Sequence, residues 1–342
     1  MIKFLLEKVA DAQDLSFNEM ETAMEYIMTG RASPAQIGAF VTGLRLKGET
    51  VQEIAGAAAA MRKRAVRISP RPSNGNCLLD TCGTGGDSSR TFNISTAAAF
   101  VAAGAGARVA KHGNRGVSSR SGSADVLEAL GVDITIEPER VKRCIEEVGI
   151  GFLFAPRLHA AMKHVSEPRK ELGFRTIFNI LGPLTNPAGA EAQLLGVYDP
   201  ALCHVIAEAL ITLGTKRAMI VHGDGLDEIT TAGPTSVSYV HDGMIDEFIL
   251  NPERYGITIS RVEDLMGGTP AENAQIIEDL LRGLRGPKRD VTLLNAAAGL
   301  MVSGVAADLE AGLAKAEESV DSGAAYRKLY ALRDFTAAPT SA

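Results

Sequence analysis

Apolar residues recur at helical spacing in the first seventy residues of the chain. Phe17, Met20, Met24 and Ile27 are three or four positions apart, which places them on one face of a helix. Three capping boxes mark helix starts, namely Ser16 with Glu19, Ser33 with Gln36 and Thr50 with Glu53. Residues 1–70 are therefore predicted to form a helical domain. A domain this small buries little by itself, so it packs on the rest of the chain, on a second subunit, or on both.

The pattern changes after a Pro- and Gly-containing linker at 67–76. Short apolar runs then alternate with Ala-rich helical segments. In chain order these segments are Cys77–Asp80, Thr96–Ala105, Ala107–Ala110, Ala124–Leu130, Val132–Ile136, Leu194–Tyr198, Leu202–Leu213, Ala218–His222, Val237–Val240 and Glu247–Leu250. The alternation predicts an α/β domain over 71–342 with a mainly parallel central sheet. Residues 158–187 are loop-rich and helical, and we expect them to leave the sheet and join the helical domain in space.

Composition narrows the class of protein. The chain has 342 residues, 35 Lys and Arg against 41 Asp and Glu, and a net charge of -6. This balance argues against a nucleic-acid binder, so a bound anion needs a local site. Four cysteines without a CxxC pair argue against a disulfide scaffold or a zinc knuckle. The N-terminal apolar run is too short to predict a signal peptide, and no apolar run reaches the ~18–20 residues of a membrane span. We expect a reduced, cytoplasmic enzyme that binds neither membrane nor nucleic acid.

A glycine loop follows the first predicted strand. Gly83, Thr84, Gly85, Gly86 and Asp87 come directly after an apolar run. Glycines let backbone N–H groups approach phosphate oxygens closely. By itself the loop fits a tight turn equally well. The spacing matches neither GxGxxG nor a Walker motif.

Further residues suited to anions stand at the start of the next helices. Asn93, Ser95 and Thr96 open an Ala-rich helix, and Ser123 is predicted to cap another. Lys111 lies beside a strand end, where its charge suits a phosphate. Each feature alone also fits an ordinary cap or a solvated loop, but two such loops one strand apart favour a phosphate site.

An acid pair follows another predicted strand. Asp227 and Glu228 come after a glycine turn. Mg²⁺ is commonly bound by one or two carboxylates together with substrate phosphates. In isolation the pair is better explained as acids at a helix N-terminus. Together with the two loops it predicts a magnesium-bound, phosphorylated substrate.

These motifs resemble the anthranilate phosphoribosyltransferase family over nearly the whole chain. The segments that carry the resemblance, in the family's order, are Gly83–Asp87, Asn93–Thr96, Lys111–Arg115, Ser121–Glu128, Arg175–Pro187 and Asp227-Glu228. The resemblance implies a homodimer through the helical domain, with a fold of the nucleoside phosphorylase/phosphoribosyltransferase type. It also implies transfer of the phosphoribosyl group of phosphoribosyl pyrophosphate to the amine of anthranilate, with Mg²⁺, expected as two ions, in tryptophan biosynthesis.

The resemblance also implies roles for individual residues. Those expected at phosphoribosyl pyrophosphate are Gly83, Thr84, Gly85, Gly86, Asp87, Asn93, Ser95, Thr96, Lys111 and Ser123. Those expected at anthranilate are Gly83, His112, Asn114, Arg169, Gly182 and Pro183. Those expected at the metal are Ser95, Asp227 and Glu228. No general base is assigned, because the amine is already a neutral nucleophile, and His112 is given a positioning role.

One departure from the family pattern concerns Arg169. Pro168 is adjacent to the arginine, whereas we expect the proline two residues before it. The residue before a proline is pushed toward extended backbone, so Glu167 is expected to be extended and the sequence leaves the orientation of Arg169 open. Two other functions are weighed: a pyrimidine nucleoside phosphorylase, which has a similar architecture and Lys-His pair but lacks this loop and acid pair, and a non-catalytic nucleic-acid-binding relative.

Overall fold

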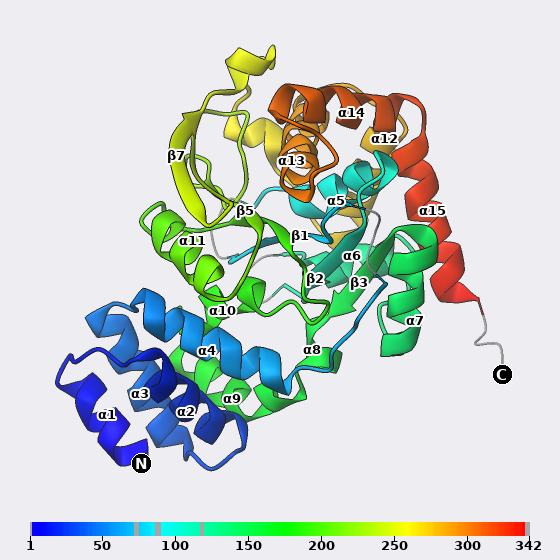
Figure 1. The fold of residues 1–342 in the computed structure, drawn as a ribbon. Coiled ribbons are helices and arrows are strands. Elements are labelled where there is room, and N and C mark those ends of the chain that lie inside the picture. The colour runs from blue at the N-terminus through cyan, green and yellow to red at the C-terminus, as the bar shows by residue number, and fades with distance from the viewer. Residues whose placement is uncertain (1, 72–74, 86–89, 117–119, 339–342) are drawn as a thin grey trace.

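The computed structural model describes residues 2–71, 75–85, 90–116 and 120–338. Its N-terminal helices are α1 (Ile2–Ala10), α2 (Phe17–Met28), α3 (Pro34–Lys47) and α4 (Val51–Arg64). The structure confirms the predicted capping boxes of α2, α3 and α4, in each of which the side chain three residues into the helix bonds back to the cap. These helices lie together at one end of the molecule (Figure 1).

A seven-stranded sheet, in the order β3-β2-β1-β4-β5-β6-β7, forms the centre of the rest of the chain. Its strands are β1 (Leu79–Gly83), β2 (Val109–Gly113), β3 (Ile150–Phe154), β4 (Ala192–Gly196), β5 (Arg217–His222), β6 (Thr235–His241) and β7 (Met244–Leu250). The first five are parallel, and β6 and β7 add an antiparallel edge. The fold is therefore the predicted helical domain plus an α/β domain with a mainly parallel sheet.

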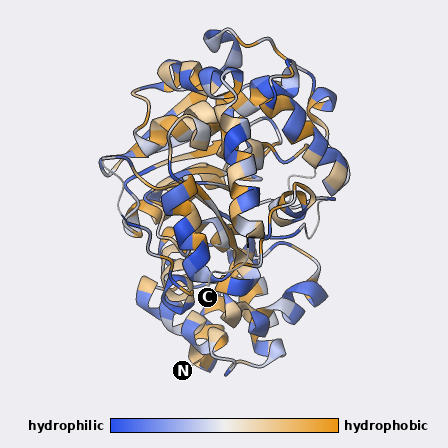
Figure 2. Ribbon diagram, turned by 90° about the vertical axis from the view of Figure 1, so that its right-hand side faces the viewer, coloured by the Kyte–Doolittle hydropathy of each residue, from blue (hydrophilic) through white to orange (hydrophobic). Residues whose placement is uncertain are grey.

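Helices cover both faces of the sheet. The helices between and after the strands are α5 (Ile94–Gly104), α6 (Ser123–Ala129), α7 (Pro138–Arg143), α8 (Ala155–Leu158), α9 (Lys163–Leu172), α10 (Ile177–Leu184), α11 (Leu202–Thr212), α12 (Pro270–Leu281), α13 (Pro287–Ser303), α14 (Leu309–Asp321) and α15 (Ala324–Ala337). One apolar core joins a sheet face to α5, α13, α14 and α15. A second joins the opposite face to α10, α11 and the N-terminal helices. The central strands are largely hydrophobic between these layers (Figure 2).

Segment 158–187 lies against the N-terminal helices. Helix α9 contacts α2 and α3, and α10 contacts α3 and α4. The buried side chains Val165 and Ile177 belong to the same apolar core as Met24 and Phe40. The helical end of the molecule is thus built from two separate parts of the chain. None of the helices in the described part of the chain is long and apolar enough to cross a membrane.

Two local predictions are wrong. Segment Val132–Ile136 is not a strand, because the Asp133 carboxylate accepts hydrogen bonds from Thr135 N and Oγ1, both at 2.7 Å, and closes a turn. The next strand is β3, which follows the left-handed Gly149 (φ 91°). Glu167 is not extended either: α9 runs through Pro168, which is buried. Packing of α9 on α2 and α3 outweighs the local preference of the residue before proline.

Candidate active site

The glycine loop leaves the central strand β1 and is held by the neighbouring strand β4. Thr84 N donates to Gly196 O (2.9 Å), and Tyr198 N donates to Thr84 Oγ1 (3.1 Å). Gly85 follows with φ 65°, a conformation that suits glycine. The loop therefore begins where a parallel strand ends, the usual position of ligand sites in such sheets. Gly86 and Asp87, also predicted here, lie outside the described residues.

Helix α5 begins beside the glycine loop, with Asn93 as its N-cap residue. Within the described residues the Asn93 side chain makes no capping bond. It donates instead to Ser121 O (3.1 Å) and accepts from Asn273 Nδ2 (2.9 Å), which ties three segments together. Ser95 N, in the first turn, donates to Glu228 Oε1 (3.1 Å). A carboxylate thus lies at the positive end of α5.

Lys111, from β2, is buried beside β1 and the start of α5. Its Nζ donates to Thr81 O and to Ser95 Oγ (3.2 Å). Burial lowers the pKa of this ammonium, whereas Asp80 and Glu228 act to raise it. The amine is therefore next to the start of α5, where an anion is favoured.

The acid pair meets the glycine loop from the other side. Asp227 Oδ2 accepts a hydrogen bond from Gly85 N (2.7 Å). A Cβ on Gly83 would lie 2.6 Å from Asp227 Oδ2, and one on Gly196 would lie 1.5 Å from Asp227 O. At Gly196 only glycine allows this approach, because the atom it meets is backbone; at Gly83 a side chain would displace the Asp227 carboxylate. The three predicted metal residues, Ser95, Asp227 and Glu228, therefore come together at the loop.

The donor set suits a hard cation. No group of three or more His, Cys, Asp or Glu side chains able to hold a metal occurs among the described residues. Two carboxylates and a hydroxyl beside an anion site match Mg²⁺, which keeps water and substrate phosphates as its other ligands. The same set offers no soft ligand for zinc or copper.

His112 lies on the opposite face of the sheet from Lys111, as alternation along β2 requires. It is buried, and burial lowers its pKa to about 3, so the imidazole is neutral. Its Nε2 has no hydrogen-bond partner in the part of the chain that the structure describes, and the Gly182 carbonyl is a backbone partner of the ring. The ring centroid lies 5.1 Å from that of His159. Sequence reasoning did not single out His159, since a lone histidine after α8 carries no motif.

Arg169 approaches the same region from α9. Its guanidinium lies 5.4 Å from the centre of the Phe178 ring in α10, and burial lowers its pKa. Phe178 precedes Gly182 by one helical turn. His112, Gly182, Pro183 and Arg169 are therefore all grouped around α10.

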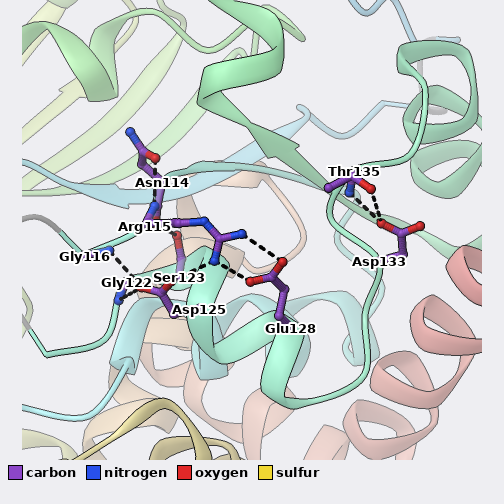
Figure 3. A network of polar contacts seen from close by, with 9 residues as sticks. All are labelled: Asn114, Arg115, Gly116, Gly122, Ser123, Asp125, Glu128, Asp133 and Thr135. Atoms are coloured by element: carbon purple, nitrogen blue, oxygen red, sulfur yellow. Dashed lines mark hydrogen bonds and ion pairs between the residues drawn. The ribbon is translucent and has the colours of Figure 1, made fainter. Parts of the chain in front are cut away.

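Asn114 lies in the loop after β2 and Ser123 begins α6, where that loop ends (Figure 3). Ser123 Oγ donates to Asn114 O (3.4 Å). The N-cap of α6 is Gly122, and Ser123 is the first residue of the helix. The Asp125 carboxylate accepts a hydrogen bond from Gly122 N (2.8 Å) and so caps the helix start. The predicted cap is thus off by one residue.

Arg115 in this loop has a structural partner. Its guanidinium pairs with Asp125 (3.1 Å) and Glu128 (Figure 3). Those two carboxylates neutralise its charge. Lys111, on β2 and not in this loop, supplies the positive charge next to the start of α5.

Comparison with known families agrees with this arrangement. Residues 3–65 match the glycosyl transferase family, helical bundle domain, and residues 75–326 match the glycosyl transferase family, a/b domain. The fold and the site therefore define a glycosyl transferase of this two-domain class.

Close relatives narrow the family further. An anthranilate phosphoribosyltransferase of Acetivibrio thermocellus is 55% identical over 337 residues, which cover 98% of this chain and 97% of the relative. One of Methanocorpusculum labreanum is 55% identical over 329 residues, covering 96% of each. The chain belongs to the anthranilate phosphoribosyltransferase family.

Solved structures show the same similarity. The crystal structure of anthranilate phosphoribosyltransferase from Thermus thermophilus superposes with a TM-score of 0.93 at 45% identity, covering 98% of this chain and 99% of that one. The enzyme from Saccharomyces cerevisiae in complex with PRPP and Mg gives a TM-score of 0.88 at 31% identity, covering 98% and 97%. These relatives support the transferase over the phosphorylase and the nucleic-acid-binding alternatives.

Proposed function

We propose that this protein transfers the phosphoribosyl group of phosphoribosyl pyrophosphate to the amine of anthranilate, giving N-(5-phosphoribosyl)anthranilate and pyrophosphate in tryptophan biosynthesis. The observation that carries the proposal is the convergence of the glycine loop, buried Lys111 and the acid pair beside His112 and α10. The expected cytoplasmic location stays a prediction.

Phosphoribosyl pyrophosphate binds at the carboxyl ends of β1 and β2. The Lys111 ammonium and the positive end of α5 attract its phosphate oxygens. The proposed residues on this side are Gly83, Thr84, Gly85, Gly86, Asp87, Asn93, Ser95, Thr96, Lys111 and Ser123.

Anthranilate binds between β2 and α10. Neutral His112 orients the acceptor without taking its proton, and the Arg169 guanidinium pairs with its carboxylate. Gly83, Asn114, Gly182 and Pro183 complete the proposed acceptor residues. A neutral imidazole suits this role because the amine needs positioning more than deprotonation.

Ser95, Asp227 and Glu228 would hold Mg²⁺, and two ions are expected. When bound, the metal supplies positive charge that offsets the charge of the pyrophosphate. The relative from Saccharomyces cerevisiae, which forms a complex with PRPP and Mg, supports the same kind of ligand pair here.

Reaction occurs by displacement at the anomeric carbon of the ribose. Negative charge grows on the departing pyrophosphate, and Lys111 together with the positive end of α5 stabilises that charge. The acceptor site holds the amine in line with the breaking bond. Closure of the helical domain over the sheet would keep water from the activated sugar.

The test is the double variant Asp227→Asn with Glu228→Gln, followed by loss of anthranilate fluorescence in the presence of phosphoribosyl pyrophosphate and Mg²⁺. We expect turnover to fall by about 10²-fold or more, since charge stabilisation of the leaving group is lost. The metal dependence should also weaken. Unchanged turnover and unchanged metal dependence would show that the metal assignment is wrong.

The helical domain is also proposed to form a homodimer. Phe4 of α1 and Leu46 of α3 are 59% and 81% exposed, and Phe174 after α9 is 40% exposed. Arg45 lies over the Phe174 ring at 4.9 Å, so the Phe174 ring and the end of α3 are neighbours. Exposed apolar side chains on these elements support an interface there.

A further inference from the structure

Two polar side chains lie beneath the proposed acceptor site, on the face of the sheet that faces α10. Asp80 of β1 and Gln193 of β4 are register partners in neighbouring parallel strands. They are 0% and 1% exposed. Alternation places both on the face opposite Lys111. Neither belongs to the residues proposed for substrate or metal.

Asp80 connects β2 to the segment after α10. Its Oδ1 accepts His112 N (3.1 Å) and its Oδ2 accepts Asn186 Nδ2 (2.7 Å). Asn186 Nδ2 also donates to Ala110 O (2.8 Å). One carboxylate therefore holds the backbone of His112 and, through Asn186, the end of the segment that contains Gly182 and Pro183.

Gln193 holds the same segment one strand away. Its Nε2 donates to Pro183 O (2.8 Å), the backbone carbonyl in the last turn of α10. Its Oε1 is buried without a hydrogen-bond partner in the described structure. A buried acceptor without a hydrogen bond destabilises the folded state. If packing were the only role of this residue, an apolar side chain would give a more stable protein.

We propose that Asp80 and Gln193 are positioning residues that set the acceptor wall formed by His112, Gly182 and Pro183. The inference rests on the proposed function and identifies the residues that orient its acceptor site. Asp80 controls the β2 side of the wall and Gln193 the α10 side. A shift of about 1 Å in such a wall is enough to cost ~10²-fold in rate.

The test uses Gln193→Met, which keeps the size of the side chain, and Asp80→Asn, which keeps its shape. We expect each variant to raise the KM for anthranilate about tenfold while the KM for phosphoribosyl pyrophosphate changes less than twofold. Ser319→Ala is the matched control, because Ser319 Oγ makes a buried bond to Val101 O (2.8 Å) between α14 and α5. It should lower stability without moving either KM.

A double-mutant cycle separates positioning from general weakening. Asp80→Asn and Asn186→Ala break the same link, so the double variant should raise the KM for anthranilate no more than about twofold beyond the larger single effect. The proposal would be overturned if the two single effects on the KM for anthranilate multiplied in the double variant. It would also be overturned if the KM values for anthranilate and for phosphoribosyl pyrophosphate rose equally.

A readout that needs no turnover keeps this inference distinct from the proposed function. The ring resonances of His112, followed by NMR in the unliganded protein, should shift in both Asp80→Asn and Gln193→Met but not in Ser319→Ala. Unshifted resonances would overturn the positioning role. Absence of anthranilate turnover in the unmodified protein, with these shifts present, would count against the proposed function alone.

Discussion

His112 and His159 are buried side by side as neutral imidazoles, and their burial lowers the free energy of unfolding at acidic pH. Burial lowers the pKa of His112 to about 3 and that of His159 to about 4. Below pH ~6.5 both histidines become protonated in the unfolded chain but stay neutral in the folded chain. The unfolded state therefore binds more protons, and stability is lost as pH falls. Asp80 acts in the opposite direction, because burial raises its pKa to about 6 and the folded state binds that proton first. The two histidines outweigh the one carboxyl.

We therefore expect the free energy of unfolding to be smaller at pH 5 than at pH 7.5. His159→Gln should reduce that difference by up to about 2 kcal/mol, since one titrating group of 1.36 kcal/mol per pH unit is removed. Urea denaturation at the two pH values measures the effect. A variant that retains the full difference would show that His159 is not the group responsible.

Arg169→Ala tests the proposed carboxylate partner of anthranilate. The guanidinium is partly buried beside Phe178, and loss of a charge-assisted bond to a bound carboxylate costs about 1.5–3 kcal/mol. We expect the KM for anthranilate to rise about 10- to 100-fold, measured by the fluorescence assay. Arg169→Lys should restore it only in part, because lysine lacks the planar fork. An unchanged KM in Arg169→Ala would remove the residue from the acceptor site.

At the scale of elements, the close approach of the acid-pair segment to β1 and β4 depends on glycine. Gly83→Ala would push a Cβ to 2.6 Å from Asp227 Oδ2 and displace that carboxylate. We expect turnover to fall at least tenfold and the concentration of Mg²⁺ for half-maximal activity to rise, both measured in the fluorescence assay. Gly38→Ala is the control, since a Cβ at Gly38 in α3 meets nothing within 4 Å and alanine favours helix. Equal effects of the two variants would contradict the prediction.

The elements that the sequence predicts correctly are those specified by local signals. Capping boxes at Ser16, Ser33 and Thr50 mark helix starts because both partners of each bond are three residues apart. The apolar run Val132–Ile136 does not form a strand, because Val132 and Ile134 are buried from within a turn. Asp133 N there bonds Thr336 Oγ1 (3.1 Å), 203 residues away, which no local pattern reveals.

The same distinction applies to the site. The glycine loop, Lys111 and the acid pair stand at strand ends, so their convergence follows from a parallel sheet. The pairing of His112 with His159, and of Asp80 with Gln193, depends on tertiary packing and strand register. Neither pair has a motif of its own.

At the scale of the whole molecule, the proposed dimer makes a direct prediction. Phe4→Glu combined with Leu46→Glu places charge on the exposed apolar side chains of α1 and α3. We expect light scattering after size-exclusion chromatography to change from twice the chain mass to the 36.0 kDa of one chain. The control Met244→Glu alters a 57% exposed residue at the far edge strand β7 and should leave the mass unchanged. A monomeric unmodified protein would contradict the proposal.

The place of β1 in the sheet has a consequence for synthesis on the ribosome. β1 pairs with β4, whose last residue is Gly196, and α13 covers these strands and ends at Ser303. Helix α5 contacts β1, but α13 also contacts β4. Translation proceeds at about 5–20 residues per second, so α13 is made several seconds after β4. Ala192 and Leu194 of β4, which share a core with α13, therefore stay without this cover for that interval of synthesis.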